Sequence, residues 1–347
     1  MQAARPLRVW VLSDGQPGHY NLSRGIVAAL ALRHSVEEYW LDVRLRAGLA
    51  RNVMRGLLNH RPSPPPIGWL RLFYLLSALP ETPCDVIVSA GGKTSFANAW
   101  LAGHLRVPNI FAGSLRRLSP RLFDVVLTLE PVEPPAPNNL VVALPPSAVD
   151  AVQVNRAGQA LRKELNLTGQ GIWTLMAGGD GAGYRYHASD WRQLAQVLNR
   201  LASEHGIRWL LLGSRRTGAV AEELLSEHIE ARHVAASRWY RQADAGGIDA
   251  WLGAAARIFV TEDSMTMITE ALYSGRPVTS LRPVSVSATP RYTNMIERFA
   301  NEGWIQRYAI EELAVGRETL DSVPDNNMPP ADHLSRLSRK LYQHLPL

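Results

Sequence analysis

Short apolar runs alternate with longer segments of helical periodicity along the whole chain. The first apolar run, 8–13, ends in the loop sequence DGQPGH at 14–19. The segment after it, up to residue 33, has apolar residues at helical spacing. A buried strand, a glycine-containing loop and a helix form the opening unit of a doubly wound parallel sheet, so this order predicts the start of a Rossmann-like domain.

The same alternation continues to the end of the chain and favours a parallel α/β fold. Further strands are predicted at 36–41, 85–89, 108–112, 124–129, 171–177, 207–212, 257–260 and 277–281, with helices at 189–202, 265–274 and 331–347. Six prolines lie between residues 131 and 146 and interrupt this pattern, which is typical of a linker. We therefore expect one domain at 1–145, a second at 146–330, and a terminal helix at 331–347 that packs back on the first domain.

Length and composition support two folded domains and exclude several classes of protein. The chain has 347 residues, too many for one ordinary core, and 46% of them are hydrophobic, which excludes intrinsic disorder. The single cysteine, Cys84, cannot form an internal disulfide or a cysteine-based zinc site, and indicates a reducing compartment. The longest uncharged stretch, 134–149, is too short and too rich in proline to span a bilayer. We expect a cytoplasmic protein.

The charge of the chain is basic and unevenly placed. The formal net charge is +6, and only three of the 37 basic residues are lysines. Codon bias explains this excess of arginine most simply, although arginine is also the residue that binds phosphates through a planar fork. Between residues 43 and 80 there are six arginines and no Asp or Glu. The position of this acid-free stretch is more informative than the total charge.

A helical interpretation of the acid-free stretch places Arg44, Arg51 and Arg55 on one face. Leu45, Leu49, Val53 and Leu57 would then form a separate apolar stripe, and Trp69 and Phe73 follow after a proline-rich turn. Basic, aromatic and apolar residues together suit an anionic membrane surface at the inner face of the cytoplasmic membrane. A solvated charged face over a buried stripe explains the pattern equally well. Nucleic acid is a weaker third partner, because no recognition motif accompanies the charge.

Polar loops in the first half carry candidate chemistry. The loop at 14–19 leads into a helix N-terminus, which favours anions, and His19 there is suited to act as a general base or to hold a phosphate. The alternative is a capping loop with an exposed histidine. A second loop, Gly91-Gly92-Lys93-Thr94, lacks the first glycine of a phosphate-binding P-loop, which argues against nucleotide hydrolysis of that type.

Three loops in the second half are suited to a nucleotide diphosphate. GGDG at 178–181 leaves backbone free to approach a ligand, and GSRR at 213–216 puts two arginines beside a flexible turn. TEDS at 261–264 follows a buried strand, and Asp263 or Ser264 is expected to cap the helix that begins at Met265. Glu270, in the second half of that helix, is suited to bind a ribose diol. No pair of carboxylates or His/Asp/Glu cluster has metal-binding spacing in these loops, so we expect no metal.

Three segments resemble the mitochondrial fission factor family, whose plant members are named for elongated mitochondria. They are the loop at 13–21, the turn at 90–94 and above all the sequence from Val260 through Glu270 to Pro277. This resemblance implies a GT-B glycosyltransferase-like fold of two Rossmann-like, doubly wound parallel-sheet domains that face a central cleft. It is similar in layout to the peptidoglycan N-acetylglucosaminyltransferase, which adds a sugar to a lipid-linked acceptor. There a loop with a histidine follows the first strand on the acceptor side, and a glutamate of an E-A-x-x-x-G-x-P motif holds the ribose. His19 and Glu270 occupy the matching places.

These observations give each candidate residue an expected role. The expected catalytic residues are His19 and Asp14, either of which would be the general base of an inverting reaction. The expected donor-binding residues are Gly178, Gly179, Gly213, Ser214, Arg215, Thr261, Glu262, Asp263, Ser264, Met265 and Glu270. The expected acceptor-side residues are Gly15, Pro17, Gly18, Gly91, Gly92, Lys93 and Thr94. The residues expected to face a membrane are Arg44, Arg51, Arg55, Trp69 and Phe73.

The leading functional hypothesis is a metal-independent glycosyltransferase. It would use a nucleotide-sugar as substrate, without a cofactor, and a lipid-linked or cell-envelope glycan as acceptor. One alternative is a non-catalytic adaptor at a membrane surface that kept the fold and lost the chemistry. Another is a nucleotide-sugar epimerase, which needs no acceptor. No nucleic acid is expected as a partner.

Overall fold

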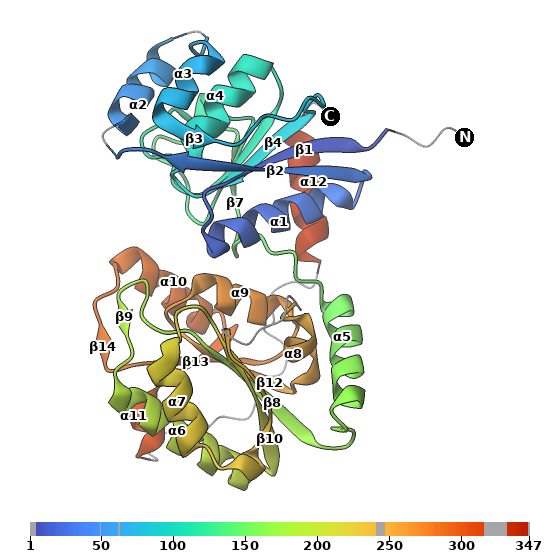
Figure 1. Ribbon diagram of the computed structural model, residues 1–347, viewed down its shortest axis with the longest axis vertical. Helices are drawn as coiled ribbons and strands as arrows, with labels where there is room; N and C mark the ends of the chain where they lie inside the picture. The colour runs from blue at the N-terminus through green and yellow to red at the C-terminus, as the bar shows by residue number, and fades with distance from the viewer. Residues whose placement is uncertain (1–4, 49, 62, 241–246, 316–331, 346–347) are drawn as a thin grey trace. The chain divides into compact units, whose positions relative to one another are not determined.

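The computed structural model describes residues 5–48, 50–61, 63–240, 247–315 and 332–345. They form two compact units, the first comprising residues up to Ala148 together with the segment from Asp332, the second comprising Val149–Ala331 (Figure 1). The division falls three residues after the predicted boundary. The backbone of Ser147 lies so close to Gly25 that a Cβ built there would be 2.3 Å from its nitrogen. This close contact with the first helix keeps residues 146–148 in the first unit.

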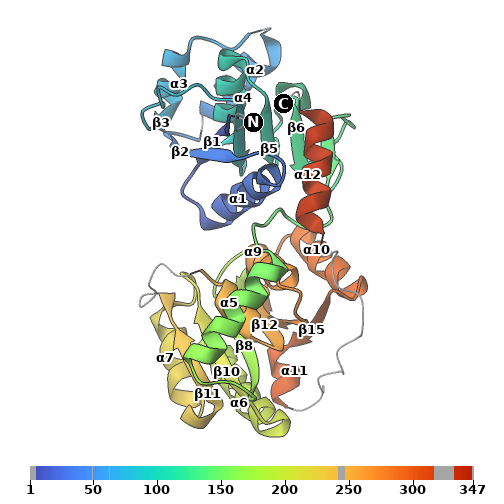
Figure 2. The ribbon, with the colours of Figure 1, turned by 90° about the vertical axis from the view of Figure 1, so that its right-hand side faces the viewer.

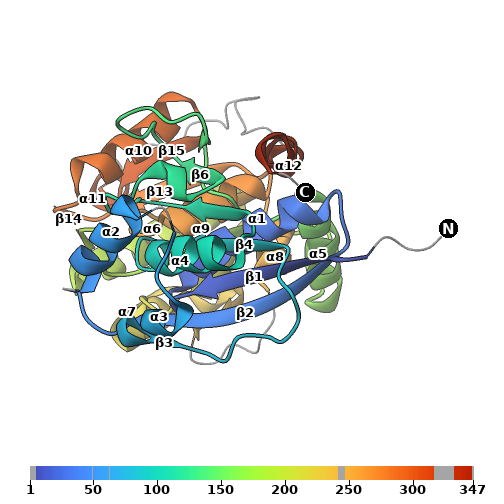
Figure 3. The same cartoon turned by 90° about the horizontal axis from the view of Figure 1, so that it is seen from above.

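The first unit has a seven-stranded sheet in the order β3-β2-β1-β4-β5-β6-β7. Its strands are β1 (Leu7–Ser13), β2 (Val36–Leu45), β3 (Tyr74–Leu76), β4 (Val86–Ala90), β5 (Asn109–Ala112), β6 (Val125–Thr128) and β7 (Asn139–Val141). Its helices are α1 (Pro17–Ala31), α2 (Ala50–His60), α3 (Ile67–Phe73), α4 (Ser95–Leu105), α12 (His333–His344) and the short 3-10 helix Pro120–Leu122. Only β3 is antiparallel to its neighbour. Figure 3 shows β4, β1 and β2 side by side.

Alternation along β1 divides the core of the first unit into two layers. Trp10 and Leu12 pack with α2, α3 and α4 on one face of the sheet. Val9 and Val11 pack with α1 and α12 on the other. The terminal helix packs beside the C-terminal end of α1 (Figure 2), with the Tyr342 hydroxyl donating to the Leu30 carbonyl at 3.1 Å. The predicted terminal helix thus packs on the first unit.

The second unit has a six-stranded parallel sheet in the order β11-β10-β8-β12-β13-β15. Its strands are β8 (Gly171–Ala177), β10 (Ile207–Gly213), β11 (Val234–Arg238), β12 (Arg257–Thr261), β13 (Val278–Arg282) and β15 (Ile305–Ala309), with β9 (Tyr184–Arg185) and β14 (Ser285–Val286) paired separately. Its helices are α5 (Ala151–Glu164), α6 (Ala188–His205), α7 (Gly218–His228), α8 (Asp249–Ala254), α9 (Met265–Tyr273), α10 (Pro290–Asn301), α11 (Ile310–Ala314) and the 3-10 helix Ala231–His233.

Helices cover both faces of this sheet as well. Leu175 of β8 and Trp209 of β10 pack with α6, α7 and α11. On the other face, the Thr174 hydroxyl donates to the Trp251 carbonyl of α8 at 2.9 Å. Both units are therefore doubly wound, as expected from the sequence.

Two sequence expectations are wrong at the level of elements. The proline-rich stretch is more than a linker, because it contains β7, whose residues 139–141 pair with β6. Arg44 does not lie on a helix: it is in β2, and its partner across the sheet is Leu75 of β3. On α2 the buried residues are Met54 and Leu58, whereas Val53 of the expected apolar stripe is 55% exposed. Leu49 of that stripe lies outside the described residues.

Candidate functional site

Each sheet has a point where the strand order reverses, and the predicted chemistry lies there. In the first unit the reversal is between β1 and β4, and in the second it is between β8 and β12. Open α/β sheets bind ligands outside the carboxyl ends of the strands at such points. The loops that begin at Asp14 and Gly91 flank the first reversal, and those that begin at Gly178 and Glu262 flank the second.

An aspartate–histidine pair occupies the first reversal point. Asp14 follows β1, Pro17 is the first residue of α1, and His19 lies in the first turn. The Nδ1 atom of His19 is 2.9 Å and 3.0 Å from the two carboxylate oxygens of Asp14. With Nδ1–H donating to the carboxylate, the ring presents Nε2 as its lone-pair nitrogen, the form of a histidine base oriented by an acid. The Asp14 side chain is 4% exposed and that of His19 is 36% exposed, so the acid is buried and the base is accessible.

The charge of Asp14 is maintained by its neighbours. Burial alone would raise the pKa of its carboxyl, but the hydrogen bond and charge of His19, the Gln16 N–H and the charge of Lys93 outweigh burial and lower that pKa. The Gln16 N–H donates to Asp14 Oδ1 at 3.2 Å. Asp14 is therefore ionised at neutral pH and suited to hold an imidazolium.

The Gly91–Thr94 turn after β4 packs against the His19 ring of this pair. Gly91 has φ of +87°, and a Cβ built on it would lie 2.2 Å from His19 Nδ1, so only glycine lets the ring sit here. Gly92 similarly lies against the side chain of Arg116. The Thr94 hydroxyl donates to the carbonyls of Ala90 and Gly91 and fixes the turn. The structure thus brings the predicted catalytic residues and the predicted acceptor-side turn together.

Glycines at the second reversal point let three loops approach one another. The Gly178 N–H donates to Thr261 Oγ1 at 2.7 Å, and a Cβ on Gly178 would lie 2.0 Å from Asp263 Oδ1. A Cβ on Gly179 would lie 2.0 Å from the carbonyl oxygen of Arg216. Gly213 ends β10, beside Ala177 of β8. The predicted loops 178–181, 213–216 and 261–264 therefore adjoin one another.

Arg216, rather than Arg215, is the arginine directed into this group of loops. Its Nη1 donates to the Asp263 carbonyl at 3.1 Å, lies 3.3 Å from Asp263 Oδ2, and is where a Cβ on Gly181 would collide. Arg215 is exposed. Ser214 and Thr217 fix the turn, since Thr217 Oγ1 accepts from the Ser214 N–H at 2.8 Å and donates to Ala177 at 2.7 Å.

Asp263 is a carboxyl group with an unusual environment. Burial raises its pKa to about 6, against the opposing effects of Arg216, Thr261 and the Gly179 N–H. Thr261 Oγ1 donates to Asp263 Oδ1 at 2.7 Å, and no hydrogen bond satisfies the buried Oδ2. A group that changes charge near neutral pH is thus placed beside an arginine and the Gly179 N–H.

The N-terminus of α9 is capped as expected. The Ser264 side chain accepts from the Met267 N–H at 3.4 Å, and the helix begins at Met265. Glu270 lies on this helix and is buried. Glu262 has a structural task that sequence reasoning missed: its fully buried carboxylate accepts from Arg307 at 2.7 Å and 3.0 Å, and from the Ser280 hydroxyl at 2.9 Å. No sequence signal marks Arg307 as its partner.

The residues expected to face a membrane differ in exposure. Trp69 is 47% exposed on α3, whereas Phe73 is partly buried, with its ring centroid 6.0 Å from that of Trp100. Arg44 is exposed on β2, and Arg51 and Arg55 are partly buried on α2. In the part of the chain that the structure describes, no group of three or more His, Cys, Asp or Glu could hold a metal ion. No helix there is long and apolar enough to cross a membrane.

The described units resemble solved GT-B proteins of low sequence identity. The UDP-GlcNAc 2-epimerase of Methanocaldococcus jannaschii is 13% identical, with a TM-score of 0.54 over 98% of this chain and all of that one. Arabidopsis thaliana UGT89C1 complexed with UDP is 12% identical, with a TM-score of 0.51 over 97% and 94% of the two chains. The kitacinnamycin glycotransferase is 17% identical, with a TM-score of 0.50 over 98% and 96%.

These similarities establish the fold, and the expected GT-B class is confirmed. No curated protein matches the chain in sequence. A family model described as mitochondrial fission ELM1 matches residues 17–345, which is nearly the whole sequence. The chain therefore belongs to the mitochondrial fission ELM1 family.

Proposed function

We propose that this protein is a metal-independent glycosyltransferase that uses a nucleotide-sugar donor. The observation that supports this most strongly is the Asp14–His19 pair, in which a buried acid orients an accessible histidine at the reversal point of the first sheet. Glycine at position 91 leaves the room that this ring position requires, since a Cβ there would lie 2.2 Å from His19 Nδ1. The second reversal point supplies what a donor requires, namely backbone N–H groups, an arginine and a helix N-terminus.

In the proposed reaction the second unit holds the donor diphosphate. The diphosphate is surrounded by the backbone at Gly178 and Gly179, the Ser214 turn, Arg216 and the N-terminus of α9 at Ser264. Arg216 exchanges its contact with Asp263 for a phosphate oxygen. As the bond from the anomeric carbon to the diphosphate breaks, negative charge grows on the leaving oxygen, and the arginine and the helix end stabilise it. These groups take the place of a metal ion.

The first unit activates the acceptor. His19 Nε2 removes the proton of the acceptor hydroxyl as its oxygen forms the bond to the anomeric carbon, and Asp14 stabilises the resulting imidazolium. Attack opposite the leaving diphosphate inverts the anomeric centre. Glu270 is assigned to the donor ribose, whereas Glu262 is left out because Arg307 occupies its carboxylate. The acceptor is a lipid-linked or cell-envelope glycan, reached at the inner face of the cytoplasmic membrane.

A titration of nucleotides and nucleotide-sugars (UDP, GDP, ADP and CMP series) by calorimetry tests the donor side. One series should bind, and Gly179→Ala should abolish that binding because its Cβ would meet the Arg216 carbonyl. His19→Gln should keep donor affinity and lower turnover by about 100-fold or more. His104→Gln, an exposed histidine at the end of α4, is the matched control. Absence of binding in every series would refute the proposal.

A second candidate, a nucleotide-sugar epimerase, is favoured by one observation: of the similar structures described above, the epimerase has the highest TM-score. An epimerase acts on the donor alone. Incubation of the bound nucleotide-sugar without acceptor, followed by NMR of the sugar, separates the two. A new epimer or free glycal under those conditions would replace glycosyl transfer as the assigned reaction.

A further inference from the structure

The carboxyl edge of the first sheet extends beyond the Asp14–His19 pair. Ser13, the last residue of β1, pairs with Asp42, but β2 continues to Leu45 and there pairs with the edge strand β3. Arg44, on this extension, and Arg46, just after it, therefore stand at the same edge of the sheet as His19. The Tyr74 hydroxyl of β3 also donates to the Lys93 carbonyl in the turn beside His19. This hydrogen bond ties the extension to the turn beside His19.

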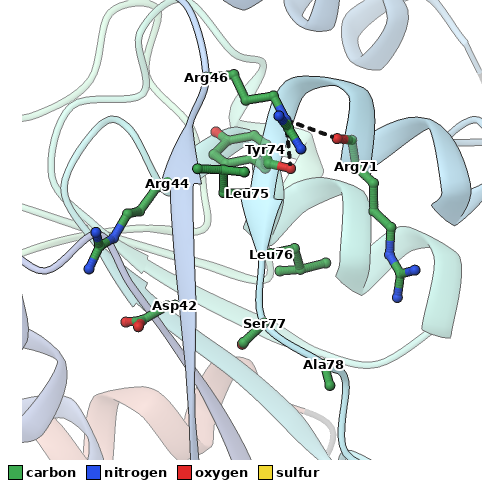
Figure 4. Close-up of a pocket in the computed structure, with 9 residues that line it drawn as sticks. All are labelled: Asp42, Arg44, Arg46, Arg71, Tyr74, Leu75, Leu76, Ser77 and Ala78. Atoms are coloured by element: carbon green, nitrogen blue, oxygen red, sulfur yellow. Dashed lines mark hydrogen bonds between the residues drawn. The ribbon is translucent and has the colours of Figure 1, made fainter.

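An open pocket of about 610 Å³ lies on this extension (Figure 4). Its lining residues are Asp42, Arg44, Arg46, Arg71, Tyr74, Leu75, Leu76, Ser77 and Ala78. Arg46 is fixed, because its Nε donates to the carbonyls of Arg71 at 3.2 Å and Tyr74 at 3.4 Å. Arg44 and Arg71 extend on the two sides of β3 in this view. Three arginines and a single carboxylate, Asp42, thus line the pocket.

Exposed apolar side chains lie on α3, which carries Arg71, and on β3, which pairs with the strand of Arg44. Leu72 is 68% exposed, Leu75 is 51% exposed and Trp69 is 47% exposed. Trp69 and Leu72 are three residues apart on α3 and so share one face. Leu75 stands on β3, an edge strand with apolar side chains open to solvent, which is a liability unless something covers it.

We propose that this surface docks on an anionic phospholipid bilayer. The docking patch consists of Arg44, Arg46, Trp69, Arg71, Leu72 and Leu75. Arg44 and Arg71 extend to opposite sides of β3 instead of converging on one point, so the arginines match a layer of headgroup phosphates better than one soluble phosphate. The leucines and the tryptophan then enter the boundary between headgroups and acyl chains. Nucleic acid would match the charge but would leave these apolar side chains uncovered.

The docking stands without glycosyl transfer, but its consequence for the acceptor rests on the proposed function. A bilayer held at the patch lies next to the edge that carries His19. An acceptor whose sugar is linked through phosphate to a lipid would then present its phosphate at the headgroup level and its sugar toward His19. This assigns the acceptor to the lipid-phosphate-linked class.

Sedimentation of the full chain with vesicles tests the docking at about 0.1 M salt. Vesicles of phosphatidylcholine with phosphatidylglycerol should bind the protein, and phosphatidylcholine vesicles should not. Arg44→Gln with Arg71→Gln should weaken binding by about 30-fold, at about fivefold for each arginine near an anionic surface. Arg106→Gln with Arg121→Gln removes the same charge at exposed positions away from β3 and should change binding less than about twofold. An equal loss in both pairs would overturn the assignment to this patch.

The exposed leucines of the patch allow a second test of docking on the bilayer. Leu72→Gln with Leu75→Gln should weaken binding to the anionic vesicles by about tenfold, because apolar surface no longer leaves water. Leu32→Gln, at an equally exposed leucine after α1, should not. Binding that millimolar inorganic phosphate abolishes, or an RNA oligonucleotide bound equally well by the leucine variant, would overturn the proposal of a lipid surface.

Calorimetry of the same wild-type preparation with nucleotide-sugars keeps the two proposals apart. Vesicle binding without nucleotide binding would remove the glycosyltransferase and leave an adaptor that docks through this patch. Nucleotide binding without vesicle binding would remove the docking patch and leave the donor site.

Discussion

Replacing Gly91 by alanine perturbs the Asp14–His19 pair without changing either functional group. Gly91 has φ of +87°, and its new Cβ would lie 2.2 Å from His19 Nδ1 and 2.3 Å from Cε1. Ordinary contacts begin at about 3.4 Å, so the ring must move by about 1 Å. The 2.9 Å hydrogen bond between Nδ1 and Asp14 cannot survive that movement.

The expected loss of unfolding free energy in Gly91→Ala has two parts. A left-handed backbone costs alanine about 1–2 kcal/mol. Loss of a hydrogen bond to a charged carboxylate costs about 1.5–3 kcal/mol. Gly91→Ala should therefore lower the free energy of unfolding of the first unit by about 2.5–5 kcal/mol. Gly15→Ala is the matched control, because Gly15 has φ of +74° and nothing within 4 Å of its built Cβ, so it loses only the first part.

Urea denaturation measures the two free energies, and ¹⁵N NMR of the histidine rings reports which nitrogen of His19 carries the proton. We expect Gly91→Ala to be the more destabilised variant and to lose the Nδ1–H form that Gly15→Ala retains. Equal destabilisation of the two variants with an unchanged His19 tautomer would refute the packing of the ring on Gly91.

Other parts of the structure give further expected outcomes. Burial raises the pKa of Asp263 to about 6, so the folded state holds this proton more tightly than the unfolded state does, and the group adds stability as pH falls from about 6 toward 4. A bound diphosphate would favour the same protonated form, so the affinity for the nucleotide-sugar should rise over that pH window. Calorimetry should show this rise in the wild type and no pH dependence in Asp263→Asn. Pairing of Arg307 with the fully buried carboxylate of Glu262 predicts that Glu262→Gln lowers the unfolding free energy by about 3–5 kcal/mol; a loss under about 1 kcal/mol in urea titration would contradict it. Leu341→Ala, on α12 against α1, should cost about 2–5 kcal/mol, and an unchanged stability would mean that the terminal helix does not support the first unit.

Sequence patterns located the loops well because parallel strands are marked by their own composition. A buried apolar run followed by Gly, Asp, Glu or Ser identified the ends of β1, β4, β8, β10 and β12. The carboxyl ends of parallel strands meet at one edge of a sheet, so finding the strands also located the loops. The resemblance to a known family then assigned roles to residues in those loops. A helix cap at Asp263 or Ser264 followed from local chemistry alone, and the structure has Ser264 in that place.

Non-local pairing explains what the sequence could not give. Arg44 has helical spacing to Arg51 and Arg55, but pairing with Leu75, far along the chain, holds it in a strand. The choice of Arg216 over Arg215 depends on where one turn aims its side chains. Arg307 meets Glu262 only because β15 joins the sheet beside β13, a strand that local patterning did not indicate. In each case the deciding partner lies on another element.

The central claim is that the reversal point between β8 and β12 binds a nucleotide diphosphate. Calorimetric titration of the wild type and of Gly179→Ala with the nucleotide series tests it most directly, with Gly169→Ala as a control whose built Cβ has nothing within 4 Å. We expect the wild type and Gly169→Ala to bind one nucleotide-sugar series and Gly179→Ala to bind none. A wild type that binds none, or a folded Gly179→Ala that binds with unchanged affinity, would contradict it.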